Sequence, residues 1–577
     1  MGRLVSGLSW LKEQKSLLAL VAATTLLGLG LRYYGLGDQI ILDDEWHGLR
    51  RAGALGVDRL ATTQFKGATS IAMNVYHRLL LEYWGWSEVS VRSLSILTTL
   101  ATLVFLPLVV ARAFQSKLLA ILVAVEFAIS PFWIFYGQSS RPYAPFLFFT
   151  LLGLYCLYRA TLERSYRAWF GYAVSAMLAS YFHLFALPAF AAAAVVPLSR
   201  LYSSARRDGL RSPEFRRELW PQLLGHALAV ALLVAAFLPA VQRGMLERLP
   251  AQQGLQFFDG RSVQHAIELL SGIRFVVAGA ILLGLSLLGL RLLSRRNATF
   301  IATLGAAALG SLVFTLVTKP YDYHVAIVAL RYNIVLFPLF FLGIAGAVEF
   351  ASTLPSRAPA RFSWARQSWI AAAVALLFIA VSIVLSPIPR ALAIQPNNFR
   401  LHSAYQQNYS KWSRRRAYDS DMFSDGVRQK ASALSKFYGK LAATGHPCEI
   451  IEYPMPLPDA WNPYYFYQRH HGCNVSIGYS RHCPIGSILY GIDPPERAHF
   501  RRLVNIDEHD DLLRSGADYL IVHVDLDREN EGALDRKPVT GKEVRRVVRR
   551  LNQALGTPVF EDDQLLVFSL KPKPAKH

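Results

Sequence analysis

The segment SLLALVAATTLLGLGL, residues 16–31, and the segment LDDEWHG, residues 42–48, decide the fold class of this chain. The first segment is built of apolar and small residues. With its flanks it is long enough to cross a hydrocarbon layer of about 30 Å as a helix. Lys12 and Lys15 precede it and Arg32 follows it, as in a signal peptide, but no small-residue cleavage site comes after it. We therefore expect an uncleaved first membrane-spanning helix.

Apolar runs of about 20 residues recur along the chain as far as residue 388 and then stop. The sequence therefore predicts an α-helical polytopic membrane protein with about 11 transmembrane helices. Two short helices that meet near residues 182–184 are expected in one stretch, and a re-entrant hairpin is the alternative there. The other expected spans are 17–36, 91–111, 118–136, 142–158, 221–240, 273–293, 299–318, 330–350 and 369–388.

The basic residues between these spans predict how the chain is oriented. Lys and Arg gather in cytoplasmic loops, so we expect the N-terminus and the loop around residues 206–217 to be cytoplasmic. Residues 37–90 are then a long outer loop. Residues 1–388 hold 34 Lys and Arg against 18 Asp and Glu, and residues 389–577 hold 27 against 22. Because most of the net charge of +21 lies between hydrophobic segments, it indicates loops facing anionic lipid head groups rather than a nucleic-acid partner.

Residues 389–577 form a second predicted domain, a soluble α/β domain outside the cytoplasm, after the transmembrane domain of residues 1–388. Its expected strands are rich in β-branched and aromatic residues, and its expected amphipathic helices each end at a glycine. The order of strands and helices predicts a partly parallel sheet. The strands are expected in 448–454, 474–479 and 518–526, and the helices in 426–445 and 542–556.

Three cysteines lie in this second domain. Cys448 and Cys473 each directly precede a predicted strand. If the two strands are parallel neighbours, their first residues lie about 5 Å apart, within reach of a disulfide. Cys473–Cys483 is the alternative pairing. Cys156 lies in a predicted span and is expected to pack there, and the cysteine spacing does not resemble a zinc site.

The motif LDDEWHG places three carboxylates, Asp43, Asp44 and Glu45, directly after the first span. Mutual repulsion and partial desolvation both raise carboxyl pKa values unless a cation compensates. The functional interpretation is a general base or a metal-binding carboxylate at an outer-face active site. The alternative is a solvated helix cap, since Asp is a favoured N-cap residue.

Two further motifs carry arginines. FYGQSSRPYAP, residues 135–145, places Arg141 in a very short turn between two spans, where it can pair with a phosphate or simply extend to the membrane interface. KPYDYHVAIVALRYN, residues 319–333, places Arg331 inside a predicted span, and an ionisable group there is a functional candidate. The alternatives are a misplaced span boundary or an ion pair with Asp322. The same segment carries Lys319, His324 and Tyr332.

Weaker candidates are His183, at the predicted meeting point of the two short helices, and Tyr76 and His77. The last two lie in an amphipathic stretch, residues 70–86, that we expect in the membrane interface. Glu126 falls in the middle of a span, where it is either buried and protonated or paired with an arginine. The three stronger motifs share one property, because the predicted topology places all of them at the outer membrane face.

The motifs follow a recognisable order: LDDEW, NVYHRLLLEYWGWSEVSVRSLS, SPFWIFYGQSSRPYA, YFHLFALP and RYNIVLFPLF. Over about residues 17–350 this order resembles the GT-C glycosyltransferases, in particular the protein O-mannosyltransferases and the lipid A aminoarabinose transferase. The resemblance implies that an acidic residue of the first outer loop is the catalytic base and that arginines hold the donor phosphate. Asp44 then matches the base, with Glu45 as its acidic neighbour, and Arg141, Tyr143 and Arg331 match the donor site.

The chain departs from the family pattern in three places. Asp43 is an additional acidic residue beside the expected base, Ser139 and Ser140 replace Glu-Ala, and residues 73–76 replace Pro-Leu-Tyr-Tyr. The last difference affects the expected contacts with the acceptor.

The loop lengths indicate the same kind of donor. The largest predicted cytoplasmic loop, about residues 200–220, is too short for a nucleotide-sugar-binding domain, which needs about 50 residues or more. Because the predicted cytoplasmic loops leave no room for a domain that binds a nucleotide sugar, a sugar transferase acting on the outer face would use a sugar linked to polyprenyl phosphate. The sequence thus predicts an inverting glycosyltransferase, in a bacterial inner membrane, with a lipid, glycan or protein acceptor. A transporter or flippase, which typically shows paired halves, is the main alternative, and a non-catalytic assembly protein is another. No metal-ligand set is predicted, and participation of a divalent metal ion stays open.

Overall fold

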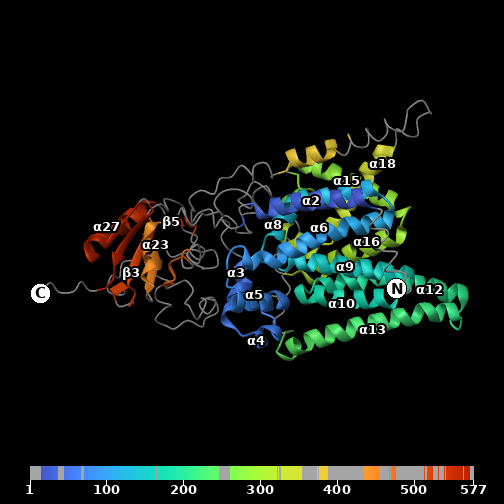
Figure 1. The fold of residues 1–577 in the computed structure, drawn as a ribbon, viewed down its shortest axis with the longest axis horizontal. Coiled ribbons are helices and arrows are strands. Elements are labelled where there is room, and N and C mark those ends of the chain that lie inside the picture. Colours follow the sequence, from blue (N-terminus) through green and yellow to red (C-terminus); the bar gives the residue numbers. More distant parts are fainter. Residues whose placement is uncertain are drawn as a thin grey trace.

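A computed structural model describes most of the helical part of the chain and the core of its C-terminal sheet. The helices form one bundle, and the sheet lies beyond one end of it (Figure 1). The described residues are 14–34, 36, 44–65, 70–163, 165–245, 260–273, 275–320, 323, 326–353, 373, 376–386, 435–445, 448–453, 467, 470–475, 512–513, 516–523, 530–531, 538–539, 541–562 and 564–571.

Within these residues, seven helices are long and apolar enough to cross a membrane, and nine if each of two bent pairs is one span. The first bent pair, α7–α8, turns by 63° and the second, α17–α18, by 89°. The straight spans are α2 (Lys15–Tyr33), η1–α6 (Ser90–Arg92 and Ser93–Phe114), α9 (Tyr143–Glu163), α11–α12 (Ala186–Ala193 and Val195–Asp208), α13 (Pro213–Gln242), α15 (Val276–Ser294) and α16 (Ala298–Thr318). The bent pairs are α7 (Lys117–Ile129) with α8 (Pro131–Gly137) and α17 (Ala326–Tyr332) with α18 (Leu336–Thr353).

These nine candidates correspond to nine of the expected spans, so the chain is an integral membrane protein. A tenth expected position holds α10 (Tyr166–Phe182), whose 17 residues form a slightly shorter helix packed along α9 and α13. The last expected span, 369–388, is described only at residues 373 and 376–386. Helices α10 and α11 meet at residues 183–185, as the two-helix interpretation predicts.

Short helices cover the end of the bundle that faces the sheet. The predicted outer loop contains α3 (Asp44–Ala54), α4 (Val57–Ala61) and α5 (Ile71–Tyr83), and α14 (Gly260–Ser271) lies against α8 and α17. Helix α5 covers much of the stretch expected in the membrane interface. It packs against α3, α4 and α10 and buries Asn74 and His77. Its position in the membrane interface stays a prediction.

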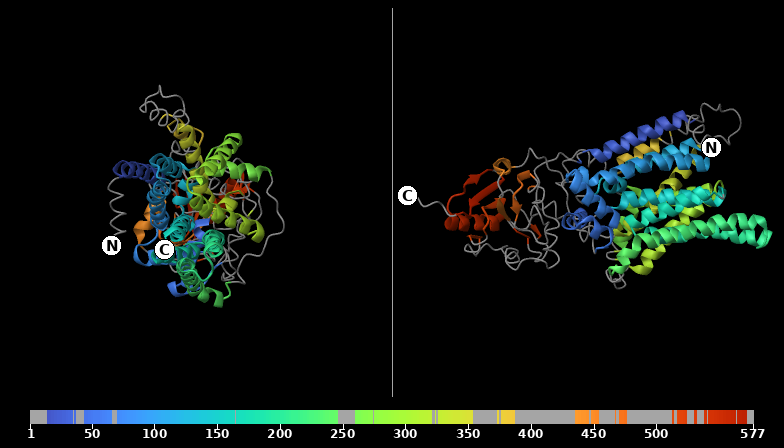
Figure 2. Two further views of the ribbon diagram at one scale, coloured as in Figure 1. Left: turned by 90° about the vertical axis from the view of Figure 1, so that its right-hand side faces the viewer. Right: turned by 60° about the horizontal axis from the view of Figure 1, so that its bottom comes forward.

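The turn between α12 and α13 lies at the opposite end of the bundle from α3–α5 and the sheet (Figures 1 and 2). This arrangement separates residues 206–217 from the C-terminal domain, as the predicted topology requires. Which end faces the cytoplasm stays a prediction from the charge distribution, and so does the domain boundary at residues 388/389.

The C-terminal domain contains a five-stranded sheet in the order β2-β1-β3-β7-β6. Strand β1 (Glu449–Tyr453) runs parallel to β2 (Asn474–Val475) and β3 (Tyr519–His523), which confirms a strand at each of the three predicted positions and the partly parallel sheet. Residues 476–479 of the second predicted strand lie outside the described residues. The antiparallel hairpin of β6 (Phe560–Glu561) and β7 (Leu565–Ser569) was not predicted. Helices α23 (Lys436–Thr444) and α27 (Gly541–Leu555) match the predicted ones, and β4 (Asn530–Glu531) pairs with β5 (Pro538–Val539).

The predicted disulfide between Cys448 and Cys473 is confirmed. Glu449 pairs with Asn474 in the parallel ladder, so the two preceding cysteines start neighbouring strands. Their Cα atoms lie 4.7 Å apart. Cys483, the alternative partner, lies outside the described residues.

Candidate active site

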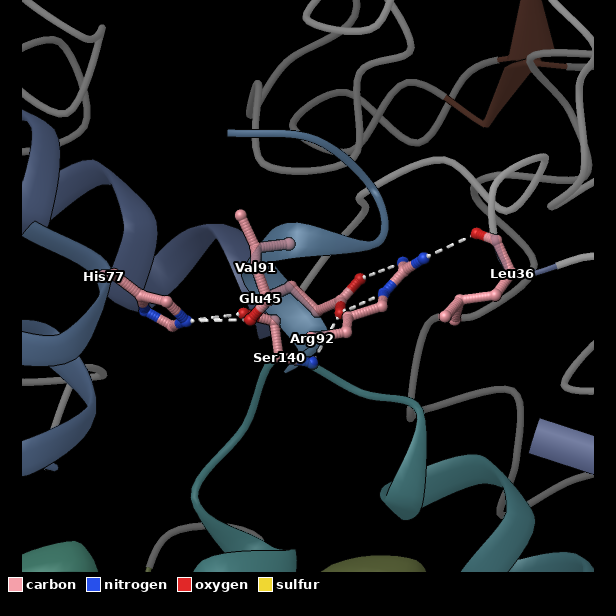
Figure 3. A network of polar contacts seen from close by, with 6 residues as sticks. All are labelled: Leu36, Glu45, His77, Val91, Arg92 and Ser140. Carbon is pink, nitrogen blue, oxygen red and sulfur yellow. Dashed lines mark hydrogen bonds and ion pairs between the residues drawn. The ribbon is translucent and has the colours of Figure 1, made fainter. Parts of the chain in front are cut away.

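Glu45 forms a buried ion pair at the end of the bundle that α3 covers (Figure 3). Its Oε1 accepts from Arg92 Nε at 2.9 Å and its Oε2 from Arg92 Nη2 at 2.6 Å, which is a bidentate pair. Arg92, in η1, is fully buried, and its Nη1 donates to the Leu36 carbonyl at 3.4 Å. Oε1 also accepts from the backbone N–H of Ser140 at 2.6 Å. The acidic segment is thereby fixed both to the start of α6 and to the turn between α8 and α9.

The side chain of Ser140 links the same turn to α5 (Figure 3). Its Oγ lies 2.8 Å from His77 Nε2, and that nitrogen lies 3.2 Å from the Val91 carbonyl. Because a carbonyl can only accept, the contact with Val91 requires the proton on Nε2. His77 is fully buried. Burial lowers the pKa of His77 to about 4, with a further lowering by the charge of Arg141, so the imidazole is neutral at pH 7.

A second cluster begins at the next residue, Arg141. The guanidinium carbon of Arg141 lies 5.9 Å from the ring centroid of Tyr143, the first residue of α9. The guanidinium carbon of Arg331, from the last turn of α17, lies 5.7 Å from the same ring. Tyr143 and Arg331 are buried, and Ser95 Oγ fixes the Arg141 carbonyl at 3.1 Å. Two cations from distant parts of the sequence thus converge on one aromatic ring.

His183, in the turn between α10 and α11, joins this cluster. Its ring lies 5.7 Å from that of Tyr143 and 5.9 Å from that of Tyr332, and it stacks on Phe146 at 5.1 Å. Burial, Arg331 and Arg141 together lower the pKa of His183 to about 3. The imidazole therefore stays neutral and lies in a strongly positive local potential.

This geometry suits an anion. Each guanidinium lies over an aromatic face, and both charges act on His183, so the positive local potential favours an anion. Arginine binds a phosphate through two parallel N–H bonds. Each of the two cations lies close in sequence to a bent helix pair. Arg141 follows α8, the second helix of the first pair, and Arg331 precedes the 89° bend between α17 and α18.

The structure thus brings together most of the residues expected to form a site. Glu45 and His77 belong to the first network, and the second cluster contains Arg141, Tyr143, His183, Arg331 and Tyr332. Tyr76 lies beside the first network and hydrogen-bonds Ser93. Asp44 begins α3, but its side chain is outside the described part of the chain, as are Asp43 and His324.

Sequence reasoning missed Arg92 as a site residue and gave Ser140 no role beyond a departure from the family pattern. Arg92 directly precedes an apolar run, where an arginine that extends to the interface looks the same in sequence as a buried one. Its distance of 47 residues from Glu45 leaves no local signal for the pair. Among the described residues no group of three His, Cys, Asp or Glu side chains is placed to hold a metal ion.

The apolar bundle, with its end helices and its C-terminal sheet, has the fold of a solved membrane protein, ArnT. The structure of ArnT from Cupriavidus metallidurans in the apo state is similar, with a TM-score of 0.51, 13% identity, and coverage of 96% of this chain and 98% of that chain. ArnT is the lipid A aminoarabinose transferase, so the expected resemblance to that protein is confirmed for the fold. The resemblance to protein O-mannosyltransferases stays a prediction.

Two further structures are similar. ArnT from Cupriavidus metallidurans bound to undecaprenyl phosphate has a TM-score of 0.51 and 14% identity, with 96% of this chain and 98% of that chain covered. A mutant of the arabinofuranosyltransferase AftD from Mycobacteria has a TM-score of 0.49 and 16% identity, over 97% of this chain and 42% of that chain. No protein-family model and no curated protein sequence matches the chain.

Proposed function

We propose that this chain is an inverting glycosyltransferase that moves a sugar from a polyprenyl-phosphate donor to an acceptor at the outer membrane face. The observation that carries this proposal is the convergence of Arg141 and Arg331 on the Tyr143 ring. In the proposed complex these cations hold the phosphate head while its lipid tail lies along the apolar helices. The similar fold of ArnT, solved with undecaprenyl phosphate, supports a lipid phosphate as the anion.

In the proposed reaction, an acceptor hydroxyl or amine attacks the anomeric carbon and loses a proton to a positioned carboxylate. General-base catalysis of this kind typically contributes about 10²- to 10⁴-fold. The bond from the anomeric carbon to the phosphate oxygen breaks, and polyprenyl phosphate leaves as a stable anion. Arg141 and Arg331 stabilise its growing negative charge. A single displacement inverts the anomeric centre.

We assign the base to Asp44 rather than to Glu45. Both oxygens of Glu45 already accept hydrogen bonds from Arg92, and one of them also accepts from the Ser140 N–H. A proton taken up there would break a buried ion pair, so Glu45 is better suited to positioning the segment that carries Asp44. Asp44 precedes it directly at the start of α3, and Asp43 is the alternative base.

The remaining parts of the proposal follow from the topology. The charge distribution favours a cytoplasmic α12–α13 turn, which puts the site and the C-terminal domain on the outside of a bacterial inner membrane. The acceptor is then a lipid, glycan or protein exposed there.

The proposal is tested in two steps. Mass spectrometry of lipids and envelope glycans, with and without the protein, identifies the sugar and the acceptor. Transfer by purified wild type is then compared with Asp44→Asn and Asp43→Asn variants. We expect Asp44→Asn to lose transfer by at least about 10²-fold while it still folds and binds undecaprenyl phosphate.

A milder loss is expected for Asp43→Asn. A fully active Asp44→Asn beside an inactive Asp43→Asn would move the base by one residue. Normal transfer in both variants would exclude both aspartates from the chemistry, and no transfer by wild type would overturn the proposed function.

A further inference from the structure

Arg32, in the last turn of α2, is fully buried although it lies within a candidate membrane span. Its Nη1 donates to the Ala128 carbonyl at 3.0 Å and to the Gly28 carbonyl at 2.9 Å, and its Nη2 donates to the Phe127 carbonyl at 3.1 Å. All three acceptors are neutral. Within the described part of the chain, Arg32 forms no ion pair with a carboxylate, so its burial needs a different explanation.

The explanation lies in the bend between α7 and α8. Pro131 begins α8 and has no N–H, so it cannot donate to the Phe127 carbonyl four residues earlier. The 63° bend at this point also separates α8 from the last turn of α7, where the Ala128 carbonyl lies. An unpaired backbone carbonyl in the bilayer costs several kcal/mol. Arg32 supplies N–H donors to both of these carbonyls.

The same side chain also lies against the far end of α8. A Cβ atom added to Gly137, the last residue of α8, would lie 2.8 Å from Arg32 Nε and 2.9 Å from Thr99 Oγ1. Arg32 therefore links the last turn of α7 to the last residue of α8, across the bend between them. The chain then continues through Ser140, which binds Glu45, to Arg141, which lies on Tyr143.

We propose that Arg32 is a positioning residue that fixes α8, and with it the turn that places Ser140 against Glu45 and Arg141 in the donor site. This inference rests on the proposed function for its catalytic meaning, although its structural part stands by itself. Arg32 does not belong to the Arg141–Arg331 cluster, and it acts through the α7 carbonyls that it binds and through its contact with Gly137. A lysine keeps the charge, but its compact ammonium cannot reproduce the planar fork of donors.

The test compares three variants of the full-length protein. Arg32→Gln removes the charge and most donors, Arg32→Lys keeps the charge, and Gly137→Ala pushes Arg32 aside while leaving it intact. The control is Asn297→Ala at the opposite end of the bundle, where Asn297 donates to the Ala113 carbonyl and to Tyr158 Oη, at 2.9 and 2.8 Å. Unfolding temperature, amide hydrogen exchange of the peptide covering residues 132–141, and the Kd for undecaprenyl phosphate are measured in each.

We expect faster exchange in residues 132–141 and an approximately tenfold higher Kd in Arg32→Gln and Gly137→Ala, since a misplaced group costs about this much or more. Arg32→Lys should fall between them and wild type. Asn297→Ala should leave the exchange of residues 132–141 and the Kd unchanged, even if it lowers the unfolding temperature as much as the Arg32 variants do.

Unchanged exchange in both Arg32→Gln and Gly137→Ala would overturn the positioning role. Changed exchange with an unchanged Kd would overturn the link to the donor site. If wild type binds no undecaprenyl phosphate, the proposed function fails, and the exchange data still decide what Arg32 does to α8.

Discussion

The two ends of the helical bundle both use arginine, in opposite ways. At the end next to the α12–α13 turn, Arg296 Nη1 pairs with Glu349 at 2.6 Å and its Nη2 donates to the Phe114 carbonyl at 2.6 Å. These contacts connect the α15–α16 turn to α18 and α6, and the arginine charge is balanced within the protein. At the other end, Arg141 and Arg331 converge on Tyr143.

We interpret the Arg296–Glu349 pair as structural and the Arg141–Arg331 cluster as a binding site. An arginine that is neutralised by a carboxylate holds helices together, and its charge needs no ligand to balance it. Arg141 and Arg331 both lie against the buried Tyr143 ring, and two cations at one ring make the local potential positive, which favours an anion. Burial lowers the pKa of His183, and the charges of Arg331 and Arg141 in the second arrangement lower it further.

The largest stability effect is expected at the Glu45–Arg92 pair, which resembles the neutralised pair at the opposite end but is much more deeply buried. Arg92→Ala leaves the Glu45 carboxylate buried without its main partner, which typically costs about 3–5 kcal/mol. The free energy of unfolding in mixed micelles measures this loss. The double variant Arg92→Ala with Glu45→Ala should be more stable than Arg92→Ala alone. Equal or lower stability of the double variant would show that the pair does not explain the loss.

A pH effect should come from His77, at the same end. Its pKa in the folded protein is about 4, below the ordinary value of 6.5, so the unfolded chain binds more protons between these values. Stability is then fully present above pH 6.5 and falls as the pH drops toward 4, by up to about 3 kcal/mol. His77→Asn should flatten the unfolding free energy against pH in this range. An identical slope in the variant and wild type would assign the pH dependence to other groups.

The smallest effect is expected from Arg296→Ala at the other end. Arg296 is 42% exposed at its side chain, and an exposed pair typically contributes about 0.2–1 kcal/mol. We expect a drop in unfolding free energy of this size and an unchanged Kd for undecaprenyl phosphate. A Kd raised as much as in site variants would mean that the two ends are coupled, and the comparison between them would fail.

Much of this architecture could be predicted because it follows from local pattern. Apolar runs gave the span positions, and the pair Cys448 and Cys473, each just before a strand, gave the disulfide. Arg141 and Arg331 are 190 positions apart in the sequence. The sequence predicted that both lie at the same membrane face, but not that they contact the same ring.

The rest depends on non-local packing. Nothing near Arg32 in the sequence indicates that it binds carbonyls about 95 residues away, and Pro131 marks a bend without giving its angle. The amphipathic pattern of α5 did not reveal which other helices it packs against. His77 is buried because α5 packs against α3 and α10.

The most direct test of the account is the Kd for undecaprenyl phosphate of Arg141→Ala and Arg331→Ala, with Arg296→Ala as the matched arginine control. A hydrogen bond to a charged group contributes about 1.5–3 kcal/mol, so each site variant should bind about 10- to 100-fold more weakly than wild type. The control should bind as wild type does. Wild-type affinity in both site variants would contradict the claim that this cluster holds the phosphate of a lipid-linked donor.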